Sequence, residues 1–157
     1  MKKLFAIVLT FALLASLPVT AFAANTTGGK ADITTSIAPT YTVTIPATVE
    51  LKKVDTEGVI TYENDYTLTA EAGVRLKKNE YIEVTVASDF IMTTTEGATL
   101  EYGITANDTA VANDGIVAEF DTDKSQQTAT IHIAANDPDF AGEYKDTVTF
   151  TVAVKTN

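Results

Sequence analysis

The sequence predicts an all-β fold, an antiparallel β-sandwich of about eight or nine strands, and three observations support this prediction. Apolar residues recur at every second position over most of the chain beyond residue 30. Clusters of Gly, Asn, Asp and Ser separate these alternating stretches at short intervals. No stretch after the first 23 residues carries the 3.6-residue apolar period of an amphipathic helix.

The first element is a signal peptide at residues 1–23 of the 157-residue chain. Lys2 and Lys3 give it a positive start, an apolar run covers residues 4–17, and Ala21 and Ala23 are the small residues that a signal peptidase accepts. The alternative is a membrane anchor, but the run is shorter than the roughly 20 residues of a spanning helix. We therefore expect cleavage after Ala23, a secreted bacterial protein at the cell surface, and no membrane insertion afterwards.

The next element is a flexible mature N-terminus at residues 24–30, which is polar and contains Gly28 and Gly29. Residues 31–157 then form a single β-sandwich domain, a length that suits one compact unit. Within it, Tyr41, Val43 and Ile45 alternate with threonines and predict the first clear strand. Pro46 follows directly and indicates a strand end or sheet edge, because proline cannot donate a ladder hydrogen bond.

Five more alternating stretches follow, at residues 66–70, 82–86, 100–104, 129–133 and 144–154. Side chains two residues apart on a strand point to the same side, so each stretch has one buried and one exposed face. Between them, Asn113-Asp114-Gly115 is the strongest hairpin signal, because Asp-Gly readily takes the positive φ angles of a type I′ turn.

Short strands at this spacing are typical of an immunoglobulin-like sandwich, with a barrel as the alternative. The Cys-Trp-Cys arrangement of antibody domains is absent, because the chain has no Cys and no Trp. The predicted core consists of Val43, Ile45, Leu68, Ile82, Val84, Val86, Ile104, Ile131, Val148, Phe150 and Val152.

Composition excludes several functions. The chain has 11 basic and 21 acidic residues, and removal of Lys2 and Lys3 leaves 9 − 21 = −12 in net charge. Such a balance argues against nucleic acid as a partner, which requires clustered Lys and Arg. The single His132 lies on the polar side of its predicted strand, and no serine lies in a Gly-x-Ser-x-Gly pattern. We therefore expect no enzyme, no catalytic residue and no cofactor.

Calcium binding by loop aspartates is one alternative. Asp121, Asp123 and Ser125 have the first three ligand spacings of an EF-hand loop, but Gln126 and His132 stand where that loop requires Gly and Glu. Two further loop carboxylates, Asp137 and Asp139, flank Pro138. Solvated turn acids are the simpler interpretation of all four aspartates.

Threonine is abundant, with 26 residues in the mature chain, and exposed strand faces explain nearly all of them. An ice-binding array would need a fixed repeat, which is absent. A sugar-binding module is the main functional alternative, since Tyr81 and Tyr62 fall on the predicted outer faces. Tryptophan, the usual platform residue of such modules, is missing.

Ala31, Ile33, Thr35 and Ile37 form an alternating stretch between a polar terminus and Pro39. The simpler interpretation makes it the first strand of its own sandwich. The alternative is strand donation, in which residues 24–38 fill a groove in a neighbouring subunit and link chains head to tail.

Two segments resemble known families. The closing segment AGEYKDTVTFTVAV, residues 141–154, resembles the last strand of secreted bacterial sandwich subunits, including spore coat protein U-type and pilin-like domains and the immunoglobulin-like repeats of Gram-positive surface proteins. The match rests on Gly142, Tyr144, Asp146 and Thr147. Residues 40–51, TYTVTIPATVEL, resemble exported Firmicutes proteins akin to WxL cell-wall proteins, although the defining Trp is absent.

These resemblances imply a non-catalytic coat, filament or other cell-surface structural subunit. Its partners would be other copies of itself or other surface proteins, with a cell-wall or host glycan as the further possibility.

Overall fold

The computed structural model describes residues 33–157, so the predicted signal peptide and residues 24–30 lie outside the described residues. The strands are β1 (Val43–Thr44), β2 (Lys52–Thr56), β3 (Val59–Ala70), β4 (Glu80–Ala87), β5 (Ile91–Thr93), β6 (Thr99–Ala106), β7 (Thr109–Ala110), β8 (Gly115–Phe120), β9 (Gln127–Asn136) and β10 (Thr149–Thr156). Among the described residues, no helix has the length and hydrophobicity needed to cross a membrane.

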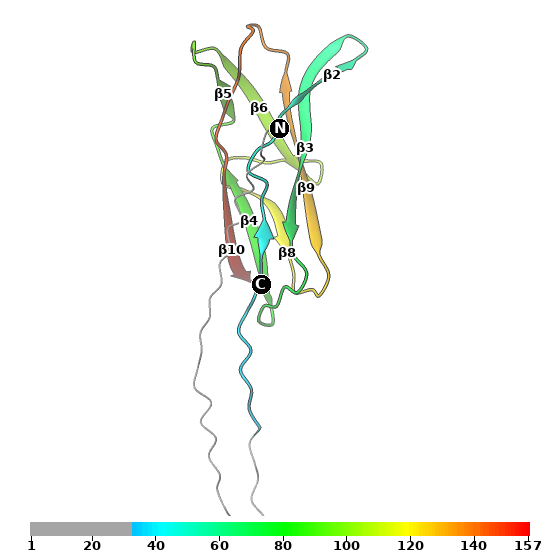
Figure 1. Cartoon of the computed structure of the whole chain (residues 1–157), viewed down its shortest axis with the longest axis vertical. Helices are drawn as coiled ribbons and strands as arrows, with labels where there is room; N and C mark the ends of the chain where they lie inside the picture. Colours follow the sequence, from blue (N-terminus) through cyan, green and yellow to red (C-terminus); the bar gives the residue numbers. More distant parts are fainter. Residues whose placement is uncertain (1–32) are drawn as a thin grey trace, which may run out of the picture.

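The strands form two sheets, and every pairing is antiparallel. The larger sheet has the order β1-β3-β9-β6-β5, with β2 added on β3 and β7 on β6, and the smaller sheet has the order β10-β4-β8. Figure 1 shows them as an elongated sandwich. The predicted fold class is confirmed, and the two very short strands β1 and β7 account for the higher strand number.

The longest ladder joins β3 to β9, from Thr61 opposite Asn136 to Ala70 opposite Gln127. In both strands the predicted alternation holds, because Leu68 and Ala70 of β3 and Ile131 and Ile133 of β9 are buried while the residues between them are more exposed. The strands β3 and β9 therefore form the centre of the larger sheet and one wall of the core.

The Asp114-Gly115 hairpin prediction is wrong. Asp114 does have a positive φ of 61°, but β7 pairs with β6 in the larger sheet and β8 pairs with β4 in the smaller one. The turn therefore carries the chain from one sheet to the other. A two-residue hairpin instead joins β2 to β3 through Glu57 and Gly58, whose φ angles of 55° and 88° suit a type I′ turn.

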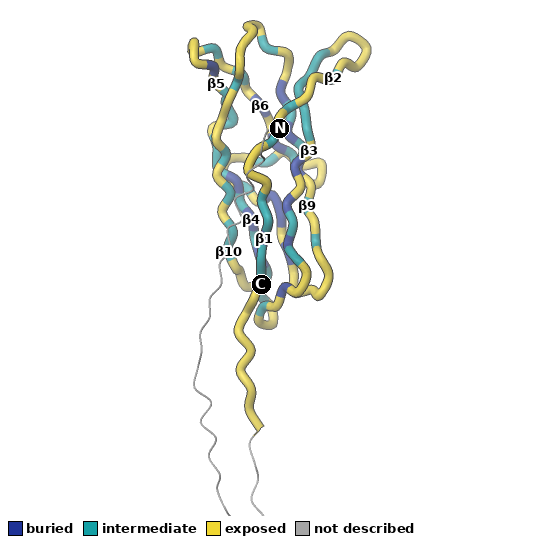
Figure 2. The backbone as a smooth tube through the Cα atoms, viewed as in Figure 1, coloured by how far each residue is buried: buried dark blue, intermediate teal, exposed yellow. Residues whose placement is uncertain are grey.

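Most of the predicted core is buried between the sheets, as the tube in Figure 2 shows along β3, β4 and β9. Residues predicted correctly as buried are Val43, Leu68, Ile82, Val84, Val86, Ile104 and Ile131. Four predicted core residues are only partly buried: Ile45, Val148, Phe150 and Val152. All four lie along the same side of the sandwich.

Candidate functional site: an open seam between β1 and β10

The sandwich is open along one side, where the edge strands of the two sheets face each other. Among residues 33–157, β1 pairs with β3 alone and β10 pairs with β4 alone. Each strand therefore presents unpaired backbone groups on its outer side. Figure 1 shows the two strands running in opposite directions, β1 upward and β10 downward.

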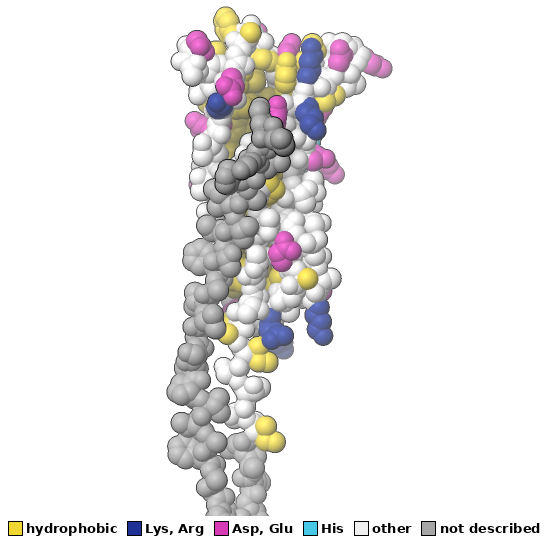
Figure 3. All heavy atoms as spheres, viewed as in Figure 1, with side chains coloured by type: hydrophobic (Ala, Val, Ile, Leu, Met, Phe, Trp, Pro, Cys, Tyr) yellow, Lys and Arg dark blue, Asp and Glu magenta, His cyan; other side chains and the backbone are white. Residues whose placement is uncertain are grey.

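An apolar groove of about 420 Å³ lies at the upper part of this seam. Figure 3 shows apolar side chains gathered in the hollow there. The lining comes from the segment after β1, from the segment that leads into β10, and from the core between them. The lining residues are Ile45, Pro46, Ala47, Thr48, Val49, Tyr66, Ile133, Asp146, Thr147, Val148 and Phe150.

The floor of the groove is an aromatic stack that joins the two sheets. The rings of Tyr66 on β3 and Phe150 on β10 lie 5.5 Å apart between centroids, with 4° between their planes. The Tyr66 hydroxyl donates a hydrogen bond to the Pro46 carbonyl oxygen. Burial raises the pKa of Tyr66 to about 12, so the hydroxyl stays protonated and keeps donating this bond.

The upper wall of the groove is fixed by Asp146. Its Oδ2 accepts hydrogen bonds from the Ser88 hydroxyl at 2.6 Å and from the Tyr102 hydroxyl at 2.5 Å. Ser88 follows β4 of the smaller sheet and Tyr102 lies on β6 of the larger sheet. Asp146 thus ties the segment before β10 to both sheets.

The pKa values at this wall favour the same arrangement. Desolvation raises the pKa of Asp146, but the hydrogen bonds from Ser88, Tyr102 and the Thr147 backbone NH together outweigh it and hold that pKa below the usual value. Burial, followed by the hydrogen bond to Asp146, raises the pKa of Tyr102. The carboxylate therefore accepts and the phenol donates across the neutral pH range.

Close packing also holds this wall. A Cβ atom added to Gly142 would lie 2.7 Å from Thr94 Cγ2, so the backbone passes directly over the buried Thr94. Two backbone hydrogen bonds join Thr93 to Lys145, at 2.9 and 3.0 Å. The segment from 142 to 146 is therefore anchored on β5 before the chain enters β10.

The structure leaves the predicted assembly strand outside the sandwich. Residues 33–39 belong to no strand, and Figure 2 shows this segment as an exposed extension beyond one end of the body. Ile33 is 98% exposed and Ile37 is 62% exposed, Thr35 is exposed as well, and Ala31 lies outside the described residues. The described part of the stretch is therefore not the first strand of its own sandwich, because it pairs with neither sheet.

The weak calcium candidates are not brought together. Asp121 and Asp123 precede β9 whereas Asp137 and Asp139 follow it, so the two pairs lie at opposite ends of that strand. Asp123 Oδ1 accepts bonds from the backbone NH and hydroxyl of Ser125, at 3.0 and 2.8 Å, and these bonds lower its pKa. Within residues 33–157, no group of three or more His, Asp or Glu side chains has the arrangement of a metal site.

His132 lies on the outer face of the larger sheet, on the predicted polar side. Its Nε2 lies 3.0 Å from Glu63 Oε2 and its Nδ1 lies 3.0 Å from Asp65 Oδ1. Both ring nitrogens therefore face a carboxylate, and this contact joins β9 to β3.

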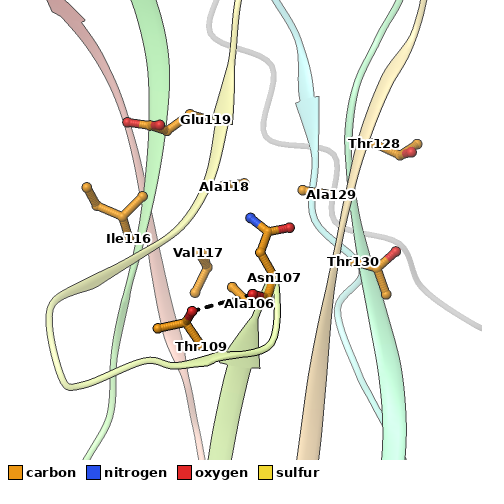
Figure 4. A pocket seen from close by; sticks show the side chains of 10 residues that line it. All are labelled: Ala106, Asn107, Thr109, Ile116, Val117, Ala118, Glu119, Thr128, Ala129 and Thr130. Carbon is orange, nitrogen blue, oxygen red and sulfur yellow. Dashed lines mark hydrogen bonds between the residues drawn. The ribbon is translucent and has the colours of Figure 1, made fainter.

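A second recess, of about 610 Å³, lies between β8 and β9 (Figure 4). Most of its side chains are small or polar, such as Asn107, Thr128 and Thr130, and Ile116 and Val117 are its larger aliphatic residues. None of the lining residues is aromatic, and Tyr62 and Tyr81, both partly buried, do not line it. The aromatic face that usually supports a sugar ring is therefore missing from this recess.

Sequence reasoning missed the seam and three of the residues that shape it, Tyr66, Ser88 and Tyr102. Alternation identifies the inward face of β10 but does not tell what covers that face. One signal pointed to the edge: Pro46, two residues after the end of β1, indicates a strand end or sheet edge.

Comparisons with known proteins give a likeness in fold. No family model matches the sequence, and the search of curated proteins finds no significant match, so the spore coat protein U-type and WxL resemblances gain no support. A chaperone–tip adhesin complex of CFA/I fimbriae aligns with a TM-score of 0.42 and 14% identity, over 74% of this chain and 42% of that chain.

The crystal structure of the P pilus rod subunit PapA aligns with a TM-score of 0.56 and 9% identity, over 75% of this chain and 100% of that chain. The described chain thus shares the immunoglobulin-like sandwich fold of a pilus rod subunit.

Proposed function

We propose that this protein is a non-catalytic structural subunit of a bacterial surface filament, secreted by means of residues 1–23, and that its subunits join by strand donation. One observation carries the proposal: the same chain has an apolar groove open along β1 and β10 and an exposed apolar arm that neither sheet accepts. The fold likeness to a pilus rod subunit supports the same conclusion.

The groove has the chemistry of a site for an extended strand. Unpaired backbone groups on β1 and β10 offer ladder hydrogen bonds to a strand placed between them. The partly buried Ile45, Val148 and Phe150 offer apolar contacts that an inserted strand would complete. Burial of further apolar area is worth roughly 25 cal/mol per Å².

The arm has the matching pattern. Ile33 and Ile37 are four residues apart and share one side of an extended strand with Thr35 and Ala31. Residues 33–39 extend past the end of the body, away from the groove of their own chain (Figure 1). A second copy is therefore the natural acceptor, and the resulting contact is heterologous and builds an open chain of subunits.

The geometry selects one direction for the inserted arm. In a head-to-tail chain, the acceptor's own arm leaves at one end of its sandwich. The donor body must therefore lie beyond the other end. The donor arm must then run antiparallel to β10 and parallel to β1.

The test compares the full mature chain, beginning at Ala24, with a variant that carries Ile33→Asp and Ile37→Asp. We expect the mature chain to form multimers and the variant to be monomeric by size-exclusion chromatography with light scattering. A Thr34→Asp and Ser36→Asp variant is the matched control, since it adds the same charges on the other side of the arm, and it should still assemble. Equal assembly of all three chains, or monomers throughout, would contradict strand donation.

A further inference from the structure

We propose a second contact between subunits, in which the loop 73–79 of the donor docks on the acidic end of the acceptor. This inference rests on the proposed strand donation and names the surfaces that meet when the arm is seated. The partner is a second copy of this chain, identified by charge and by geometry.

The loop 73–79, which we call the basic loop, concentrates positive charge at the arm end of the molecule. Arg75, Lys77 and Lys78 are exposed, and Lys77 pairs with Glu80, the residue that follows the loop, at 3.8 Å. Residues 33–157 contain eight Lys and Arg, the total of 11 less Lys2, Lys3 and Lys30, so this one loop holds three of eight. Figure 3 shows Lys and Arg side chains at this end.

The basic loop is attached to the root of the arm. Thr40 NH donates to the Arg75 carbonyl at 2.8 Å, and Arg75 NH donates to the Thr40 carbonyl at 2.7 Å. Thr40 lies two residues after Ala38, the last residue of the proposed donor segment. The basic loop of a donor must therefore lie close to the point where the donor's arm leaves the acceptor's groove.

The opposite end of the sandwich is acidic. Asp137, Asp139 and Glu143 are exposed in the connection between β9 and β10, and Glu96 lies in the turn between β5 and β6. Lys145 is the nearby cation of this connection, and Glu143 pairs with it at 2.9 Å. Figure 3 shows acidic side chains gathered at this end with a few Lys and Arg side chains among them, and Lys52 and Lys53 of β2 lie at this end as well.

The same end also exposes apolar surface. Phe140 is 67% exposed and borders a recess of about 360 Å³ between residues 97–101 and 137–140. Carboxylates at this rim attract a cationic loop, and a docked loop would also cover the exposed aromatic ring. The connection continues into Asp146 and Val148, which line the groove, so this rim stands at the mouth of the seam.

Charge and direction agree. An arm that runs antiparallel to β10 leaves the groove near Thr149, at the acidic end, and places the donor's basic loop there. An arm inserted the other way would leave the groove near Thr156. This position lies beside the acceptor's own basic loop, because Asn157 NH donates a hydrogen bond to the Asn79 carbonyl of that loop at 2.9 Å. The donor's basic loop would then face the acceptor's own Arg75, Lys77 and Lys78, with Asp121 and Asp123 beside them, because Leu76 NH bonds to the Thr122 hydroxyl at 3.0 Å. The charge match is therefore better in the head-to-tail direction.

The experiment measures the assembly rate of the full mature chain by light scattering at low and high salt. The first variant carries Lys77→Glu and Lys78→Glu, the second Asp137→Lys and Asp139→Lys, and the third all four changes. We expect each reversal alone to slow assembly by roughly tenfold at low salt, and the fourfold variant to recover most of the rate. The differences should shrink at high salt.

A Lys52→Glu and Lys53→Glu variant is the charge control, because it changes the net charge as much as the first variant does but at the end away from the basic loop. It should not slow assembly. A fourfold variant as slow as the single reversals, or a control as slow as the first variant, would overturn the docking contact.

A synthetic peptide of residues 24–38 separates this inference from the proposed function. The peptide lacks the basic loop, so it should bind all of these variants with the same affinity. If the variants bind the peptide equally but assemble at different rates, the docking contact is supported. If they bind the peptide equally and also assemble at the same rate, the docking contact is contradicted. Absence of peptide binding to every chain would instead contradict strand donation itself.

Discussion

Phe150 packs against the core on one side and lines the groove of the open seam on the other. It has the same inward position on its strand as Leu68, which is 0% exposed, yet Phe150 is only partly buried and stacks on Tyr66. The difference lies in what covers the two residues. The smaller sheet covers Leu68, whereas nothing in the described chain covers the outer side of Phe150.

Replacement of Phe150 tests this position. In the monomer, Phe150→Ala should cost less than the roughly 3–5 kcal/mol of a fully buried Phe, because part of the ring already contacts solvent. In the assembled protein the loss should grow, since the inserted strand covers the ring. Urea unfolding of both forms measures the two losses, and Leu68→Ala, which should cost the same in both, is the control. A Phe150 loss that is equal in the two forms would contradict an inserted strand at this level.

Asp146 gives a pH-dependent prediction. Its pKa is lowered in the folded protein, so its contribution to stability is present above the unfolded value of about 3.9 and is lost as the pH falls through the folded value. Thermal melts of the wild type and of Asp146→Asn should therefore differ most at neutral pH and converge in strong acid. A difference that grows on acidification would show that the carboxylate does not act as the acceptor of the Ser88 and Tyr102 hydrogen bonds.

Among the strands and their connections, alternation predicted most of the sandwich correctly. It identified the inward faces of β3, β4, β6 and β9 because side chains on a strand alternate whatever the strand order. It could not predict which strands pair, and for that reason Asp114-Gly115 was misread as a hairpin although it connects two sheets. It also missed the short segment after Pro46, where the groove wall has no regular alternation to detect.

The segment that leads into β10 depends on Gly142. A methyl group there would meet Thr94 Cγ2 at 2.7 Å, so Gly142→Ala must displace the chain that carries Asp146. We expect a loss of about 1–3 kcal/mol in unfolding free energy, together with weaker binding of the 24–38 peptide. Gly103→Ala is the matched control, because its added methyl group has no atom within 4 Å. Equal effects of the two substitutions in both measurements would show that this close approach does not position the wall.

For the molecule as a whole, composition argues against one class of partner but points to no particular one. A net charge of −10 argues against nucleic acid, yet it conceals the separation of Arg75, Lys77 and Lys78 at one end from the acidic connection at the other. That separation depends on which loops lie at the same end of the sandwich. Strand order and direction determine this, and neither can be deduced from alternation alone.

Binding of the arm should stabilise the whole domain. A ligand that binds only the folded state adds RT ln(1 + [L]/Kd), about 2.7 kcal/mol at a concentration of 100 Kd. The 24–38 peptide should therefore raise the melting temperature of the monomeric Ile33→Asp, Ile37→Asp chain, whose groove is intact. A peptide carrying the same two aspartates should not. Calorimetry measures both, and an unchanged melting temperature with the natural peptide would remove the groove as its site.

The direction in which residues 33–39 leave the body has a mechanical consequence. They extend along the long axis of the sandwich, so a pull on a chain of such subunits would act parallel to the seated arm. Force in that direction loads all the backbone hydrogen bonds between the arm and the acceptor strands together, in shear. A force perpendicular to the arm would instead break these hydrogen bonds one after another. Such a fibre would resist stretching far better than bending at its joints.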